Sequence, residues 1–307
     1  MTTLVFGHKS PDTDSTGSPI VWAWYLNQIK GVAAKPMLLG EPNTEALFML
    51  DHWKLEKPEI LVDLAAGTPV VIVDTNNPAE LPANINEADI TGIIDHHRLV
   101  AGLETRGPIE INIQPLACTA TIMYKMIGSA DWARAPIAVK GAALSCILSD
   151  TLEFRSPTTT DEDRVVAHVI ADELGVDITS YAADMFAAKS DVSAFSEAEL
   201  LRMDSKEFDL NGTGLRVSVL ETTSPAPLLA RKDALMAAMP GVAAQDGAAE
   251  VLLFIVDILN AEATLLVPND RVKTIAEKSF GVNVAGDHVV LPGIMSRKKQ
   301  IIPNLTF

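Results

Sequence analysis

Residues 7–15 read Gly-His-Lys-Ser-Pro-Asp-Thr-Asp-Ser, and this stretch decides both the fold and the candidate chemistry. The apolar run from Thr3 to Gly7 predicts a β-strand, and a helical pattern from about Ser15 to Ile29 follows the stretch. A polar loop between a strand and a helix projects its side chains at the carboxyl edge of a sheet, where doubly wound folds bind ligands. The histidine and two aspartates of this loop suit Mn, Fe or Co. By itself, the loop is equally consistent with a polar turn and a helix-capping aspartate.

The same alternation of short Val/Ile-rich runs and longer helical patterns continues to about Ser190. It predicts an α/β fold whose first domain is a doubly wound, mainly parallel sheet with helices on both faces. Because 307 residues exceed what one core usually organises, we expect two domains. We place the first at residues 1–189 and a linker of small and polar residues at 190–196. The further strands are 69–73 and 90–94, and the helical patterns are 117–127, 136–149 and 161–174.

Residues 197–307 predict a smaller, mixed α/β domain. Strands are expected at 206–210 and 215–221, on either side of the tight-turn sequence Asn211-Gly212-Thr213-Gly214. The remaining predicted elements are a helix at 227–239 and strands at 250–259 and 263–267.

The charge of the chain limits its partners. Lys and Arg number 24 against 40 Asp and Glu, which gives a net charge of −16. This charge repels polyanions, so we expect no nucleic-acid partner, and a small anionic substrate would need clustered cations or bound metal. No apolar run approaches the roughly 18 residues of a membrane span, and no signal core precedes the first strand. We therefore expect no membrane partner and a cytoplasmic location, with Cys118 and Cys146 as buried thiols.

Two further predicted strands end in metal-ligand residues. The run Val70-Val71-Ile72-Val73 is followed by Asp74, and Gly92-Ile93-Ile94 is followed by Asp95-His96-His97. A single aspartate at a strand end is usually a turn or cap residue. Because parallel strands deliver their carboxyl ends to one edge of a sheet, these residues should meet His8, and their convergence favours a metal site.

Three weaker signals lie outside the strand ends. Asp150 ends a buried helical run, where a carboxylate needs a partner, although helix-terminal aspartates are commonly structural. Ser296-Arg297-Lys298-Lys299-Gln300 is a basic run in an acidic chain, and such a run is normally a solvated face. Lys206 alone would be a surface lysine.

Taken in order, these motifs resemble those of the family II inorganic pyrophosphatases, members of the DHH phosphoesterase superfamily. The resemblance spans nearly the whole chain, from GHKSPDTDS through Asp74, DHH and SDT to SRKKQ. It implies one metal bound by His8, Asp12 and Asp74, and a second bound by Asp14, Asp74, His96 and Asp150. It also implies that His97 contacts the substrate and that Lys206, Arg297 and Lys298 hold its phosphate oxygens.

The resemblance implies hydrolysis of pyrophosphate to two phosphates by a metal-activated bridging water at a dinuclear Mn²⁺ site. The active site would lie in the cleft between the two domains. Co²⁺ would substitute, further Mg²⁺ or Mn²⁺ would arrive with the substrate, and the protein would form a homodimer through its N-terminal domain. One departure concerns Thr75-Asn76-Asn77, which replace the family's usual His-Asn-Glu and put a supporting role of this stretch in doubt. Asp95 is expected to orient a histidine.

Three alternatives stay open at this level. A short-chain exopolyphosphatase of the same superfamily would use similar ligands, and a DHH phosphodiesterase would act on oligonucleotides. The third is a non-catalytic metal or phosphate sensor, in which the ligands bind without turnover.

Overall fold

The computed structural model describes residues 1–210 and 212–306, apart from the side chain of Lys298. The chain divides into two compact units, Met1–Ala188 and Lys189–Phe307, and each is described by itself. The linker expected at residues 190–196 remains a prediction.

The N-terminal unit is built on a six-stranded parallel sheet with strand order β3-β2-β1-β4-β5-β6. The strand order reverses between β1 and β4, so the carboxyl ends of β1, β4 and β5 lie at a topological switch point. Three strands occur where the sequence predicts them, and β2, β3 and β6 were not predicted. The strands are β1 (Thr3–Phe6), β2 (Ala34–Leu38), β3 (Glu59–Ile60), β4 (Pro69–Val73), β5 (Asp89–Asp95) and β6 (Glu110–Ile113).

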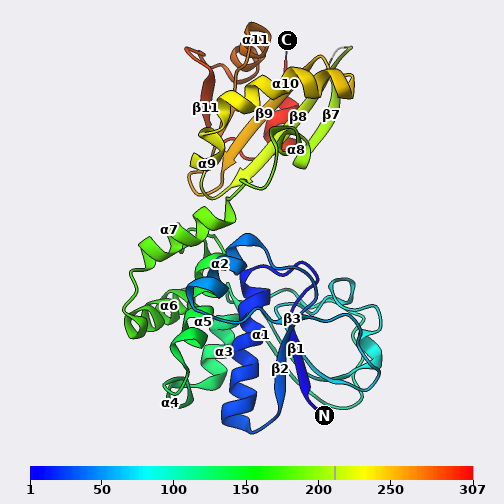
Figure 1. Ribbon diagram of the computed structural model, residues 1–307, viewed down its shortest axis with the longest axis vertical. Coiled ribbons are helices and arrows are strands. Elements are labelled where there is room, and N and C mark those ends of the chain that lie inside the picture. Colours follow the sequence, from blue (N-terminus) through cyan, green and yellow to red (C-terminus); the bar gives the residue numbers. More distant parts are fainter. Residues whose placement is uncertain (211, 307) are drawn as a thin grey trace. The chain divides into compact units, whose positions relative to one another are not determined.

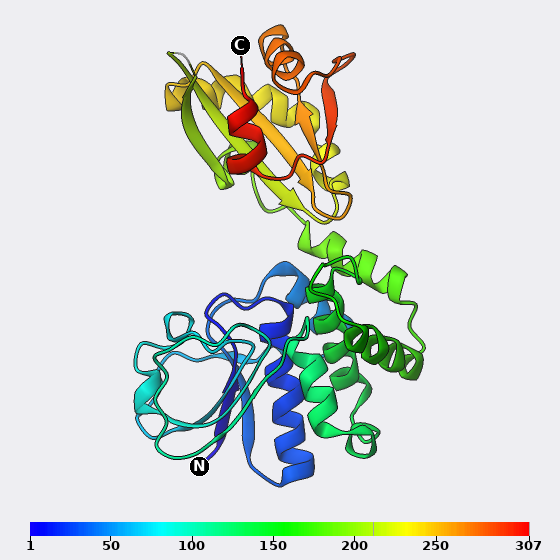
Figure 2. The ribbon, with the colours of Figure 1, turned by 180° about the vertical axis from the view of Figure 1, so that it is seen from behind.

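The helices of this unit gather on one side of the sheet (Figures 1 and 2). The central helix, α1, packs against α3 and α5, with Gly17 lying directly against Cys146. The helices are α1 (Thr13–Tyr25), continued by a π-helix at Leu26–Lys30, then α2 (Thr44–His52), α3 (Thr119–Ile127), α4 (Ser129–Trp132), α5 (Ile137–Thr151), α6 (Asp161–Leu174) and α7 (Ile178–Lys189).

The opposite face of the sheet is covered differently from the prediction. Its apolar side chains, among them Phe6 and Ile72, pack against Leu64, Leu81 and Ile85. These covering residues lie in loops and 3₁₀ turns, with short helices at Pro78–Glu80 and Ile85–Glu87. In the connection between β4 and β5, Pro82 directly follows the turn that ends the first of these short helices, a position where proline does not favour continuation of a helix. The α/β class and the mainly parallel sheet are confirmed, with α-helices on one face.

The C-terminal unit contains a five-stranded sheet with order β11-β10-β9-β8-β7. β8 and β9 are parallel and the other pairs are antiparallel, which confirms the predicted mixed domain. The expected helix at 227–239 is divided into α9 and α10, and the expected turn includes Asn211, which lies outside the described residues. The elements are α8 (Glu197–Met203), β7 (Ser205–Leu210), β8 (Thr213–Thr222), α9 (Ala226–Leu229), α10 (Lys232–Asp246), β9 (Glu250–Asp257), β10 (Glu262–Leu266), α11 (Asp270–Phe280), β11 (His288–Pro292) and a π-helix at Arg297–Ile301.

Among the described residues, no helix combines the length and apolar character needed to cross a bilayer. All tryptophans and tyrosines of the chain belong to the N-terminal unit, namely Trp22, Trp24, Trp53, Trp132, Tyr25, Tyr124 and Tyr181.

Candidate metal centre

The loop between β1 and α1 is folded by its own side chains. Asp12 is the N-cap of α1, and its Oδ1 accepts a hydrogen bond from the Ser15 N–H at 3.0 Å. Ser15 Oγ in turn accepts the His8 N–H at 2.7 Å. The other oxygen of Asp12, Oδ2, lies 3.7 Å from His8 Nε2. Asp12 is therefore both a helix cap and a neighbour of the histidine, so its capping role is compatible with its predicted role as a metal ligand.

Asp74 occupies the centre of the site. It directly follows β4, is buried, and has a positive φ of 56°, with its N–H donating to Ile94 O. Its Oδ2 lies 3.5 Å from His8 Nε2, and its Oδ1 lies 3.3 Å from His96 Nε2. Each carboxylate oxygen thus faces a different histidine, which is the arrangement expected of a carboxylate shared by two ions.

The structure brings all six predicted ligands together in overlapping groups. In each group one ligand atom per residue lies within 4.8 Å of those of the others. Asp74 belongs to two groups, and so does His96. The groups are His8, Asp12 and Asp74; Asp14, His96 and Asp150; and Asp74, His96 and His97.

Both histidines of the DHH motif contact other parts of the N-terminal unit through Nδ1. His96 Nδ1 lies 3.3 Å from Leu116 O, a contact that directs Nε2 towards the aspartates when Nδ1 carries the proton. His97 Nδ1 lies 2.9 Å from Asp95 Oδ1, so Asp95 contacts a histidine as the sequence predicts. Asn76 donates through Nδ2 to Asp95 Oδ2 and to Arg98 O. The doubt about the Thr75-Asn76-Asn77 stretch is thereby resolved, because Asn76 anchors Asp95.

Sequence reasoning missed further side chains that contact the candidate ligands. Thr119, the first residue of α3, donates its N–H to Asp14 Oδ2 at 2.8 Å, and Ser18 donates to Asp14 Oδ1. Thr119 Oγ1 also lies 3.4 Å from Asp74 Oδ1. The only sequence signal for Thr119 is its place at a helix start, which by itself predicts nothing about Asp14.

The buried carboxylates of the site repel one another, and bound cations would relieve this repulsion. Burial, followed by the charges of Asp14 and Asp12, raises the pKa of Asp74 well above its usual value. Burial and Asp14 do the same to the pKa of Asp150. Asp150 Oδ2 is buried and accepts no hydrogen bond within the described part of the chain. Four crowded carboxylates and two histidines are a donor set that fits two divalent ions of the Mn²⁺ type.

Two histidines have raised pKa values. At His8, burial opposes protonation, but the hydrogen bond and the charge of Asp12 outweigh it and raise the pKa. At His97, the hydrogen bond that its Nδ1–H donates to Asp95 is the main cause of the raised pKa. His97 is half-exposed, so its other ring nitrogen is available to a ligand.

Two of the predicted substrate-binding cations lie together in the C-terminal unit. Lys206 on β7 and Arg297 on the terminal π-helix line one pocket of about 580 Å³. The Arg297 guanidinium donates to Asp204 O at 2.8 Å and to Asp204 Oδ1 at 2.7 Å. The predicted Lys298 side chain lies outside the described residues.

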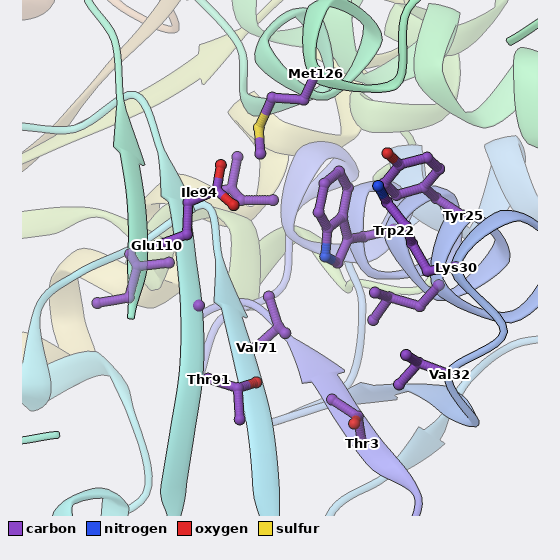
Figure 3. A pocket seen from close by; sticks show the side chains of 13 residues that line it. Thr3, Trp22, Tyr25, Lys30, Val32, Val71, Thr91, Ile94, Glu110 and Met126 are labelled. Carbon is purple, nitrogen blue, oxygen red and sulfur yellow. The ribbon is translucent and has the colours of Figure 1, made fainter. Parts of the chain in front are cut away.

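A second hollow, of about 500 Å³, lies in the N-terminal unit between the sheet and the ends of α1 and α3. Trp22, Tyr25 and Met126 face it from the helices, and Val71 and Ile94 face it from the sheet (Figure 3). It contains none of the predicted site residues.

Comparison with known proteins identifies the class of both units. Residues 2–149 match the DHH family N-terminal domain, and residues 183–306 match the DHHA2 domain. A crystal structure from Bacteroides fragilis, of an exopolyphosphatase-related protein, has a TM-score of 0.52 at 13% identity and covers 98% of this chain and 89% of that one. At that identity the likeness concerns the fold alone.

Closer relatives narrow the class. Proteins named as manganese-dependent inorganic pyrophosphatases are 40% identical in Deinococcus radiodurans, over 98% of this chain and 96% of the relative, and 36% identical in Lactobacillus acidophilus, over 99% and 97%. A crystal structure from Methanococcus jannaschii, described as a family II inorganic pyrophosphatase, is 31% identical with a TM-score of 0.63, over 99% of this chain and 98% of that one. The chain therefore belongs to the family II, manganese-dependent inorganic pyrophosphatases, which confirms the resemblance seen in the sequence.

Proposed function

We propose that this protein hydrolyses inorganic pyrophosphate to two phosphates at a site that holds two Mn²⁺ ions. The observation that carries the proposal is the position of Asp74, whose two oxygens face His8 and His96 at 3.5 and 3.3 Å. The substrate and the metal are those in the names of the full-length relatives.

We assign one ion to each of two of the ligand groups. His8, Asp12 and Asp74 would hold one Mn²⁺, and Asp14, His96 and Asp150 would hold the other with Asp74 shared. When bound, such a pair of ions lowers the pKa of a shared water from ~15.7 towards neutrality and supplies hydroxide for attack at phosphorus. Co²⁺ has the same ligand preferences, and further Mg²⁺ or Mn²⁺ would accompany the substrate.

The remaining site residues act on the phosphate groups. His97, whose pKa is raised by its hydrogen bond to Asp95, would donate a proton to the leaving phosphate through the nitrogen that Asp95 does not contact. Lys206 and Arg297, together with Lys298, would hold the phosphate oxygens and stabilise the charge that develops on them. The anion would thus be bound both by cations of the C-terminal unit and by metal ions held in the N-terminal unit.

The wider setting is also part of the proposal. The free, buried Cys118 and Cys146 suit a reducing compartment, and we place the protein in the cytoplasm. The net charge of −16 disfavours nucleic-acid partners. The family resemblance supports a homodimer through the N-terminal domain.

The test is phosphate release from pyrophosphate, tripolyphosphate and a dinucleotide by metal-stripped protein, with and without Mn²⁺. We expect fast, Mn²⁺-dependent turnover of pyrophosphate that Asp74→Ala abolishes. A preference for tripolyphosphate would instead indicate an exopolyphosphatase, a preference for the dinucleotide would indicate a phosphodiesterase, and Mn²⁺ binding without turnover would indicate a sensor.

A further inference from the structure

Glu45 is a fully buried carboxylate in the first turn of α2, outside every motif considered so far. Burial of a carboxylate is costly unless hydrogen bonds compensate for the lost water. The contacts of Glu45 therefore indicate what the carboxylate stabilises.

One oxygen of Glu45 joins two segments that are distant in the sequence. Thr13 Oγ1 donates to Glu45 Oε2 at 2.9 Å, and Ser149 Oγ donates to the same oxygen at 2.7 Å. Thr13 stands between Asp12 and Asp14, and Ser149 immediately precedes Asp150. Glu45 thus ties together the two backbone segments that carry three of the candidate ligands.

The two segments belong to helices α1 and α5, and the relative position of these helices sets the distance between Asp14 and Asp150. Thr13 begins α1 and Ser149 lies in the last turn of α5, and these two helices are in extensive contact. Cys146 Sγ adds a further link to Thr13 O at 3.4 Å. A small slide of one helix along the other would separate Asp14 from Asp150, which now lie in one ligand group.

We propose that Glu45 is a positioning residue that holds Asp14 and Asp150 at the spacing required by the second Mn²⁺. The inference rests on the proposed function, because it presumes that these residues bind the ion. Glu45 acts through the hydroxyls of Thr13 and Ser149 and does not contact the ion or the substrate.

The test is a titration of the metal-free protein with Mn²⁺ alone, in which free Mn²⁺ is measured by its EPR signal. Loss of hydrogen-bonded support behind a metal ligand typically weakens metal affinity about 10- to 100-fold. We expect Glu45→Ala to weaken the binding of one of two ions by that factor. Glu45→Gln keeps an oxygen that accepts from both hydroxyls, so it should bind Mn²⁺ nearly as wild type does. In turnover, excess Mn²⁺ should restore kcat of Glu45→Ala, with KM for pyrophosphate unchanged.

The matched control is Asp257→Ala, which removes another buried carboxylate that accepts several hydrogen bonds, in the C-terminal unit. It should lower the unfolding temperature and leave Mn²⁺ affinity unchanged. If Glu45→Ala does not fold, the combination of Thr13→Val and Ser149→Ala removes the same two hydrogen bonds and decides the question.

Two results would overturn the inference alone: wild-type Mn²⁺ affinity in a folded variant lacking these hydrogen bonds, or equal weakening by Asp257→Ala. Failure of the wild-type protein to bind Mn²⁺ would overturn the proposed function as well, so the two failures are distinguishable.

Discussion

At Asp74 both the backbone and the side chain are held in unfavourable states. Its φ of 56° lies in the left-handed region, and its carboxylate is buried beside Asp14 and Asp12. Such costs persist only where the surrounding structure imposes them, and they concentrate at functional sites. A divalent cation would remove the electrostatic part of this cost, so the site is organised for an ion before one binds.

The raised pKa values of Asp74 and Asp150 predict pH-dependent metal binding. Both carboxylates must be deprotonated to bind Mn²⁺, so apparent affinity should fall as pH decreases through their raised values. Conversely, the metal-free fold should lose stability as pH rises from the usual carboxyl pKa of 3.8 through those values, because the folded form binds the protons more tightly. Calorimetric titration with Mn²⁺ in buffers of different ionisation enthalpy measures the released protons. A binding enthalpy that is the same in every buffer would contradict this prediction.

Lys206 and Arg297 should affect the substrate and leave the metal unaffected. Hydrogen bonds to charged groups contribute about 1.5–3 kcal/mol, so Lys206→Ala or Arg297→Ala should lower kcat/KM for pyrophosphate roughly 10- to 100-fold. Mn²⁺ affinity should not change, because every candidate ligand belongs to the other unit. Steady-state kinetics at saturating Mn²⁺ give the first quantity and EPR titration the second. Lys278→Ala, on the exposed face of α11, serves as the control and should match wild type.

At the scale of elements, the contact between α1 and α5 should tolerate no added atoms. A Cβ at Gly17 would overlap Cys146 Sγ, whereas one at Gly241 in α10 would meet nothing. Gly17→Ala should therefore destabilise the protein by about 1–3 kcal/mol through overpacking. Gly241→Ala should stabilise its helix by about 0.5–1 kcal/mol, because alanine has the better helix propensity. Urea unfolding of both variants measures the difference, and equal effects would show that α1 and α5 separate easily.

The elements that the sequence predicted are those with a strong local signal. β4 is a continuous apolar run, β5 contains the apolar residues Ile90, Ile93 and Ile94, and the helix Asp161–Leu174 has a polar start and a clear apolar periodicity. β2 was missed because Pro36 interrupts it, and β6 because Glu110–Ile113 is a short, partly exposed edge strand.

The same distinction applies to the site. The convergence of the candidate ligands was predictable because each ends a strand or stands in a recognisable motif. Thr119, Asn76 and Glu45 were not, since their roles depend on hydrogen bonds to partners in other segments. The Thr119–Asp14 bond, for example, joins residues 105 positions apart.

At the scale of the whole molecule, Mn²⁺ should stabilise one unit only. All candidate ligands belong to Met1–Ala188, so an excess of 100 times Kd should stabilise that unit by about 2.7 kcal/mol and leave the other unaffected. Tryptophan fluorescence reports the N-terminal unit alone, whereas far-UV circular dichroism reports both. When thermal unfolding is followed by both signals, their midpoint temperatures should therefore lie further apart with Mn²⁺ than without it. An equal shift of both transitions would show that the units unfold as one.

The confinement of the ligands to residues 8–150 has a consequence for the order of synthesis on the ribosome. Domains of a nascent chain generally fold as units, the N-terminal one first. The unit that carries the carboxylate cluster can therefore fold while Arg297 is still untranslated. A chain halted at that stage would be able to capture metal before it possessed the full set of cations proposed to hold its substrate, so metal loading would precede catalytic competence.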